Sequence, residues 1–254
     1  MYLKSISGGA IRTLFETLKE VLHDVNLVFS PEGVRLVTMD GSRVALIYLK
    51  LRAESFEEYH CTGTVNCGVN MNSMFKLLRI TGSHDTIVMY CTTGNAHELG
   101  IRIANSERNT STDFKLKLLD VDSENIQIPA VSFDAVLTLP SAYFQRICRD
   151  MLNLSDTITV STRGPQLVLS CSGDFASQET VISEAADCMS VHTASEKNVQ
   201  GRYSLKYLTL FCRASSLSTT LEMFLKEAYP LIIKYNVASL GEIRFCLAPK
   251  MDDM

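Results

Sequence analysis

The stretch from Asp24 to Gly41 reads DVNLVFSPEGVRLVTMDG, and a second stretch of the same design, from Asp156 to Gly173, reads DTITVSTRGPQLVLSCSG. Each contains a strand-like run, a turn with a glycine (Gly33 or Gly164) and a second strand-like run, which is the pattern of a β-hairpin. Each also follows a segment with helical spacing and basic residues. We therefore interpret the chain as two copies of one unit.

A second helical segment in each half supports this repeat. The residues that match in order and spacing are Met71, Met74, Leu78 and Arg79 in the first half and Leu205, Leu208, Cys212 and Arg213 in the second. Each half then consists of a helix, a hairpin, a second helix and further strands. Only two short helices among many strands predict an antiparallel α+β fold rather than a doubly wound one.

The segment between the two halves, Lys117 to Pro129, is acidic and has no sustained hydrophobic period, so it predicts an extended connector. We expect an N-terminal domain at 1–117, an interdomain connector at 118–134 and a C-terminal domain at 135–254. The connector carries apolar Ile126 and Ile128, which either form a docking surface or pack on the sheet beneath.

Basic side chains recur on one side of four short helical segments, although the net charge of the chain is −4. Their spacing of three or seven residues places the members of each pair on the same helix face. Any single amphipathic helix shows Lys or Arg to water, but four such faces with few acidic residues favour binding to a polyanion such as DNA. The eight cations are Arg12, Lys19, Lys76, Arg79, Arg146, Arg149, Lys206 and Arg213.

Composition excludes several other classes of protein. The 254 residues, 46% of them apolar, suffice for one large or two medium domains. With no apolar run of about 18 residues and no signal peptide, we expect an intracellular protein with no membrane contact. The eight cysteines are scattered without a Cys-x-x-Cys pair, so we expect them to be reduced and mostly buried, without a metal or redox role. The absence of catalytic and phosphate-binding motifs predicts that the chain is not an enzyme and uses no cofactor.

Four separated motifs, in order along the chain, resemble one known family. They are FSPEGVRLVTMDGSRVAL at 29–46, LKLLDVDSE at 116–124, FQRICRD at 144–150 and IRFCLAPK at 243–250. The chain resembles the proliferating cell nuclear antigen (PCNA) family, the eukaryotic DNA sliding clamps, over nearly its whole length.

The resemblance implies a DNA-clamp fold and a function. Family members form a homotrimeric ring whose outer surface is made of sheets and whose hole is lined by basic helices. The ring encircles double-stranded DNA without sequence preference and serves as a polymerase processivity factor in DNA replication and repair. The implied partners are the replicative DNA polymerase, the clamp loader, flap endonuclease, DNA ligase and other proteins with PCNA-interacting peptides, in the nucleus or, for a virus-encoded clamp, at a viral replication site.

The resemblance also implies two sets of contact residues, each of which taken singly fits ordinary core or turn packing. Partner peptides would bind at Met39, Arg43, Val44, Leu46, Ile126, Ile128, Pro129, Pro230, Leu247, Ala248 and Pro249. Subunits would pair along 110–117 and 175–183, with Thr110, Phe114, Lys117, Phe175, Ser177 and Ser183 in contact.

Some positions depart from the family pattern. Arg163 and Gly164 stand where many members carry a lysine that receives ubiquitin, so the resemblance does not extend that regulation to this chain. Cys246 replaces an aromatic residue near the peptide site.

Two other functions remain open from the residues. One alternative function is that of a subunit of a damage-signalling heterotrimeric clamp. The other is an enzyme built on the cysteines, which would need a cysteine near a base and an electropositive helix end.

Overall fold

The computed structural model describes residues 1–91, 97–122, 126, 128–185, 188–194 and 198–250. Residues 123–125 and 127 of the expected connector therefore lie outside the described residues.

The chain forms two compact units, and neither is continuous in sequence. Unit 1 comprises Met1–Gly41, Ile47–Ile126 and Asn236–Ile243, and unit 2 comprises Ser42–Leu46, Gln127–Tyr235 and Arg244–Met254. The long segments change unit inside the expected connector. The short exchanged segments, 42–46 and 236–243, begin or end inside β4 (Ala45–Arg52), β17 (Leu231–Val237) and β18 (Gly241–Leu247). The two ends of each of these strands are therefore assigned to different units. A division of the sequence at one connector does not describe these exchanges.

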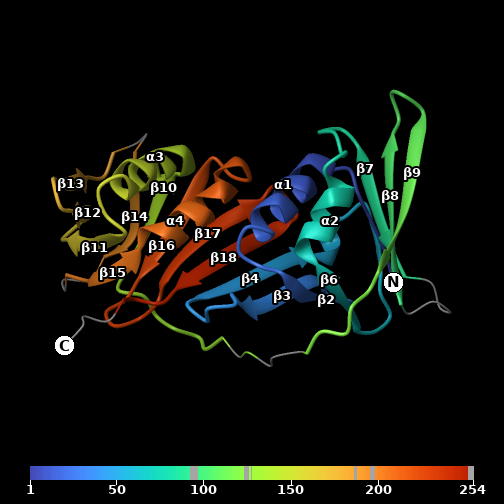
Figure 1. The fold of residues 1–254 in the computed structure, drawn as a ribbon, viewed down its shortest axis with the longest axis horizontal. Helices are drawn as coiled ribbons and strands as arrows, with labels where there is room; N and C mark the ends of the chain where they lie inside the picture. Colours follow the sequence, from blue (N-terminus) through green and yellow to red (C-terminus); the bar gives the residue numbers. More distant parts are fainter. Residues whose placement is uncertain (92–96, 123–125, 127, 186–187, 195–197, 251–254) are drawn as a thin grey trace. The chain divides into compact units, whose positions relative to one another are not determined.

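One sheet of unit 1 has five antiparallel strands in the order β5-β1-β7-β8-β9. Their bounds are Glu58–His60 (β5), Tyr2–Ser5 (β1), Thr86–Tyr90 (β7), Glu98–Asn105 (β8) and Thr110–Lys117 (β9). Strand β9 pairs with β8 over its whole length, from Asn105 opposite Thr110 to Glu98 opposite Lys117. Its other side is the edge of this sheet (Figure 1).

The predicted hairpin of unit 1 is formed by β2 (Asp24–Ser30) and β3 (Gly33–Met39), with Ser30 opposite Gly33. Strand β6 (Val65–Asn70) pairs with the other side of β2. Gly33 has a φ of +132°, and a Cβ atom there would lie 2.0 Å from the carbonyl oxygen of Leu51. This turn therefore requires glycine for both its backbone conformation and its close packing. The short 3₁₀ helix η1 (Ala53–Ser55) follows β4.

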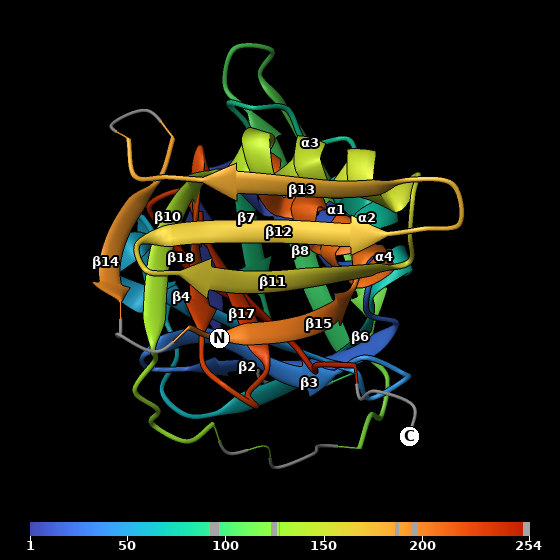
Figure 2. The same cartoon turned by 90° about the vertical axis from the view of Figure 1, so that its left-hand side faces the viewer.

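Unit 2 repeats this plan. The predicted hairpin of β11 (Thr157–Arg163) and β12 (Gln166–Ser172) turns at Gly164, whose φ is +58°. It belongs to a four-stranded sheet in the order β13-β12-β11-β15, with β13 at Ser177–Ile182 and β15 at Gln200–Ser204 (Figure 2). The remaining strands are ordered β14-β10-β16-β17, with β14 at Ser190–Ala194, β10 at Ala135–Pro140 and β16 at Thr220–Leu225. Both hairpins and the antiparallel α+β class are as the sequence predicts.

Each unit contains a pair of helices that pack against each other. In unit 1 they are α1 (Gly8–Leu18) and α2 (Met71–Leu78), and in unit 2 they are α3 (Ser141–Leu152) and α4 (Leu205–Phe211), which continues into the 3₁₀ helix η2 (Cys212–Ser216) (Figure 1). The six apolar residues of the predicted repeat are all fully buried, namely Met71, Met74, Leu78, Leu205, Leu208 and Cys212. The repeat seen in the sequence is thus a repeat of core positions. None of the described helices has the length and apolar character needed to span a bilayer.

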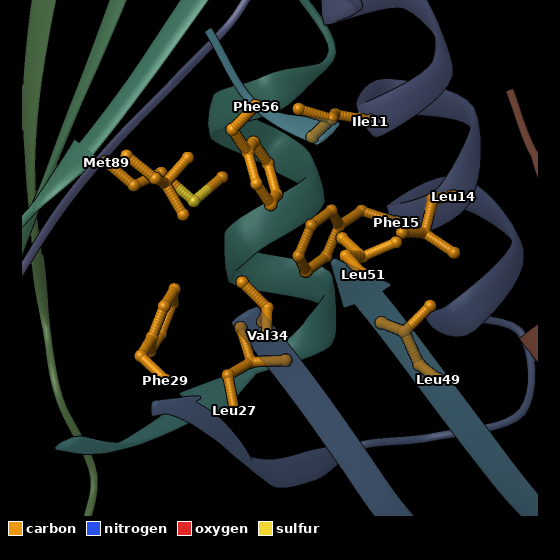
Figure 3. A pocket seen from close by; sticks show the side chains of 11 residues that line it. Ile11, Leu14, Phe15, Leu27, Phe29, Val34, Leu49, Leu51, Phe56 and Met89 are labelled. Atoms are coloured by element: carbon orange, nitrogen blue, oxygen red, sulfur yellow. The ribbon is translucent and has the colours of Figure 1, made fainter. Parts of the chain in front are cut away.

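The core of unit 1 leaves a small apolar cavity of about 20 Å³ under α1. Figure 3 shows side chains from α1 and from strands β2, β3 and β4 converging on it, together with Phe56 and Met89. Its lining is entirely apolar, so a water molecule would find no hydrogen-bond partner there and the cavity is expected to be dry. Shortening a lining side chain therefore enlarges an existing void.

Leu49→Ala is predicted to destabilise the fold by about 2–5 kcal/mol, because Leu49 is 1% exposed and lines this cavity. Urea unfolding at a fixed protein concentration measures the change. Ile80→Ala is the control, since Ile80 is 53% exposed and its truncation is expected to change the free energy of unfolding by less than about 0.5 kcal/mol. Equal effects of the two changes would contradict this description of the core.

Candidate functional site

The cations of α2 lie at its carboxyl end and point into solvent. Lys76 is in the last turn of the helix and Arg79 is its C-cap, and both side chains are exposed. The other end of the helix is fixed by Asn70, whose Oδ1 accepts a hydrogen bond from the Ser73 amide at 2.9 Å. Neither cation forms a hydrogen bond or ion pair with another residue of the described structure, so both are available to an external anion.

The cations of α1 differ from these because protein groups already contact them. Arg12 donates a hydrogen bond to the carbonyl oxygen of Thr81 at 3.0 Å. Lys19, the C-cap of α1, forms an ion pair with Glu20 and lies 5.0 Å from the centre of the Phe75 ring. The Lys19 side chain is only 21% exposed. The spacing of seven residues is present. Because protein groups already contact both side chains, they are less available to an external anion than the sequence pattern indicates.

The four cations that the sequence pattern indicates in unit 2 are all exposed. Arg146 and Arg149 lie three residues apart on α3, and the Arg146 guanidinium stacks 5.3 Å from the centre of the Tyr143 ring. Lys206 is on α4, whereas Arg213 lies in η2. Because a 3₁₀ helix has about three residues per turn, the seven-residue alignment expected for Lys206 and Arg213 in an uninterrupted α-helix is not maintained.

The residues expected to bind partner peptides fall into both units. In unit 2 the Ala248 amide donates to the Val44 carbonyl oxygen at 3.0 Å, which places 42–46 beside the C-terminal segment. Ile128 is 42% exposed and Pro129 is also exposed. The half-buried members of unit 2 are Val44, Leu46, Pro230, Ala248 and Pro249, and Arg43 is exposed. In unit 1, Met39 and Ile126 are half-buried.

Leu247 differs from the rest of this set. Its side chain is fully buried at the end of β18, so it belongs to the core and has no exposed area that a ligand could contact. The alternation of buried and half-buried residues along 241–247 accounts for this, because successive side chains of a strand point to opposite faces.

The residues expected at subunit contacts lie on or beside two sheet edges. Thr110 and Lys117 are the exposed first and last residues of β9, and Phe114 between them is half-buried. Strand β13 is the edge of the four-stranded sheet of unit 2 and begins at Ser177. Ser183 follows this strand, and its hydroxyl accepts a hydrogen bond from Gln166 Nε2 at 3.0 Å.

Large apolar side chains are exposed at the β13 edge. Phe175, just before the strand, is 79% exposed, and Val181 within it is 44% exposed. Exposed edge strands with apolar side chains are prone to pair with another chain, so both edges are candidate protein contacts. Val181 lies within the expected range 175–183 and adds an apolar side chain to the contact residues that the resemblance implies.

The cysteines differ in part from expectation. Cys67, Cys148, Cys171 and Cys212 are buried, but Cys61, Cys91, Cys188 and Cys246 are half-buried. The Sγ atoms of Cys67 and Cys91 lie 3.8 Å apart. Their separation of 24 residues gives no local motif, so sequence spacing did not indicate this pair.

Comparison with known proteins identifies the family. Residues 2–125 match the family description "Proliferating cell nuclear antigen, N-terminal domain", and residues 127–250 match "Proliferating cell nuclear antigen, C-terminal domain". The chain is also 42% identical over 252 residues to the "Probable DNA polymerase sliding clamp 1" of Paramecium bursaria Chlorella virus 1, covering 98% of this chain and 96% of that protein. With both domains matched in order along an antiparallel α+β chain, this protein belongs to the proliferating cell nuclear antigen family.

Proposed function

We propose that three copies of this chain close into a ring around double-stranded DNA and hold a DNA polymerase on its template. A member of this family is a sliding clamp and a processivity factor, not an enzyme. The observation that carries the proposal is that exposed cations recur on the helix pairs of both matched domains, at Lys76 and Arg79 in unit 1 and at Arg146, Arg149 and Lys206 in unit 2.

The chemistry of these cations suits a ligand that must move. Contacts between Lys or Arg and phosphate oxygens carry no base information, whereas hydrogen bonds to base edges would hold the protein at particular sequences. The exposure of these side chains also supports weak and exchangeable contacts, because exposed charge pairs are screened by salt and contribute little individually. Retention on DNA would then come from enclosure rather than from affinity.

Ring closure would use the two sheet edges. In this proposal β9 of one copy pairs with β13 of the next, so that Phe114 packs against the exposed apolar side chains Phe175 and Val181. Strand pairing satisfies the free backbone groups of both edges, and burial of the apolar side chains adds to the stability.

Partner proteins would bind where Ile128 and Pro129 meet solvent, and the half-buried Ile126 stands two residues before Ile128 in the sequence. Exposed aliphatic and proline side chains suit the apolar anchors of a short peptide. By this route the clamp would recruit the replicative polymerase, the clamp loader, flap endonuclease and DNA ligase, in the host nucleus or at a viral replication site. No observation specifically favours the alternative of a heterotrimeric damage-signalling clamp.

Phe114→Ala is predicted to weaken the trimer by an amount on the order of a few kcal/mol, because it removes apolar packing at the edge of β9. Light scattering and sedimentation over a range of concentrations measure the shift toward monomer. Ile6→Ala is the control, since Ile6 is 59% exposed and lies outside both edge strands. A wild-type chain that stays monomeric at high micromolar concentration would contradict the ring.

Changing Ile126 and Ile128 together to Ala is predicted to weaken the binding of a polymerase-type or flap-endonuclease-type peptide by about tenfold or more, because buried anchors carry most of the binding energy at such contacts. Titration calorimetry measures the affinity, and Ile80→Ala serves as the control for loss of an exposed isoleucine. Unchanged affinity in an intact trimer would place the peptide site elsewhere.

Arg79→Ala combined with Arg149→Ala is predicted to reduce retention on DNA clearly more than either single change. Arg12→Ala with Lys19→Ala should have a smaller effect, since these two side chains already contact Thr81, Glu20 and Phe75. Lys50→Ala, at an exposed position of β4, controls for the loss of one positive charge.

The same experiment compares linear with circular DNA. Salt should release the loaded wild-type ring from linear DNA, where it slides off an end, and much less from circular DNA, where escape requires opening of the ring. Equal loss from both templates, or a strong preference for one base sequence, would show that the basic helices serve another kind of DNA binding.

A further inference from the structure

Two cysteines of unit 1 meet although they lie 24 residues apart in sequence. Cys67 is in β6 and Cys91 directly follows β7, and their Sγ atoms are 3.8 Å apart. Both backbones are fixed by neighbours: Cys67 is opposite Leu27 of β2, and the Cys91 amide donates to the Met1 carbonyl oxygen at 2.9 Å. The sulfurs are therefore held close by the sheets and not by a mobile loop.

The two thiols differ in their access to solvent. Cys67 is fully buried, whereas Cys91 is half-buried and lines an open hollow of about 590 Å³. The other residues of this hollow are Met1, Tyr2, His60, Thr62, Val88, Tyr90 and Arg102. A small polar molecule can therefore reach Cys91 from outside, while Cys67 has no surface exposed to solvent.

The pKa values of the two thiols differ as well, and the more accessible thiol, Cys91, has the lower pKa. The hydrogen bond between the two thiols lowers the pKa of Cys91 to about 7, and the positive amino group of Met1 acts in the same direction. The same hydrogen bond, together with burial, raises the pKa of Cys67. The lowered pKa of Cys91 favours its thiolate, and the raised pKa keeps Cys67 a thiol that can donate its proton.

We propose that Cys67 and Cys91 form a modification site, a dithiol that hydrogen peroxide converts into a disulfide. The Cys91 thiolate attacks one peroxide oxygen, the O–O bond breaks, and hydroxide leaves to give a sulfenic acid on Cys91. The Cys67 sulfur then attacks the Cys91 sulfur and the S–O bond breaks, and the leaving hydroxyl takes the Cys67 proton as water. Two electrons pass from the sulfurs to peroxide.

The other cysteines, all of which the structure describes, lack this combination. Cys148 and Cys212 also interact, but both are fully buried, and hydrogen bonding to Cys212 together with burial raises the pKa of Cys148. Cys61 is accessible, and its Sγ donates to the Gly63 carbonyl oxygen at 2.9 Å. No group of three or more potential metal ligands occurs among the described residues, which favours a dithiol over a metal site.

The pair lies at the place where segment 118–122 leaves the sheet. Gly68, next to Cys67, accepts a hydrogen bond from the Leu119 amide at 2.8 Å, and a Cβ on Gly68 would approach the Leu119 carbonyl oxygen to 2.1 Å. A disulfide would therefore join β6 to the end of β7 beside the start of the expected connector. This inference concerns unit 1 alone and is independent of the proposed clamp function.

The test treats the purified full-length chain with hydrogen peroxide, then alkylates the remaining thiols and maps the peptides by mass spectrometry. The expected result is the loss of two thiols, a peptide linked between Cys67 and Cys91, and full recovery with dithiothreitol. In Cys67→Ser the Cys91 sulfenic acid should persist and be trapped by dimedone, because no thiol resolves it. Cys61→Ser is the matched control and should form the same link as the wild type.

The pH dependence of Cys91 alkylation separates the hydrogen bond from mere proximity. Cys67→Ser keeps a donor and should retain the wild-type profile, whereas Cys67→Ala removes it and should slow alkylation at neutral pH about threefold or more. The other titratable groups at this hollow, namely the Met1 amino group, Tyr2, His60, Tyr90 and Arg102, are unchanged in both variants. Circular dichroism melting confirms that each variant is folded.

Three outcomes would overturn the proposal. The first is a wild type in which Cys91 proceeds to sulfinic acid as fast as it does in Cys67→Ser. The second is a disulfide that links different copies of the chain and not Cys67 with Cys91. The third is a Cys67→Ala profile identical to that of the wild type. The first two results would show that the two thiols do not form the proposed disulfide, and the third would show that Cys67 does not activate Cys91.

Discussion

The structure depends on the burial of one face of each helix pair in the core of its own unit. Leu14 and Leu18 on α1 and Phe144 and Met151 on α3 are essentially inaccessible to solvent. Because an α-helix repeats every 3.6 residues, fixing the apolar residues at these positions fixes the direction of all the others. The cations at intervening positions then lie away from the core, exposed on α2 and α3 and half-buried on α1. The positive surfaces follow from this packing.

This constraint explains how an acidic chain presents positive surfaces. With a net charge of −4, the protein has no general attraction for nucleic acid. Local charge decides instead, because screening limits the reach of each side chain to about 10 Å at moderate ionic strength. A basic helix face can therefore attract phosphate, while carboxylates elsewhere on the chain disfavour unspecific binding.

Much of the fold could be predicted from the sequence, because the decisive signals are local. The hairpins at Gly33 and Gly164 follow from turn chemistry and alternation, and the helices follow from apolar spacing. The contacts of Arg12 with Thr81, the burial of Leu247 and the meeting of Cys67 with Cys91 depend on residues that are distant in sequence, and no local pattern records them. The exchange of 42–46 and 236–243 between units is hidden for the same reason, since one strand can begin in one unit and end in the other.

The two sheet edges proposed to join the copies are not alike. Strand β9 offers an edge with a half-buried Phe114, whereas β13 offers an edge flanked by the exposed Phe175. Because the two edges differ, each copy pairs through β9 with one neighbour and through β13 with the other. The contact is therefore head-to-tail and not related by a two-fold axis. A copy damaged at β13 alone would still attach through β9 and then end the chain of contacts. Such a subunit would act as a terminator, so in a mixed population a minority of one-sided variants would leave open arcs in greater proportion than their own number.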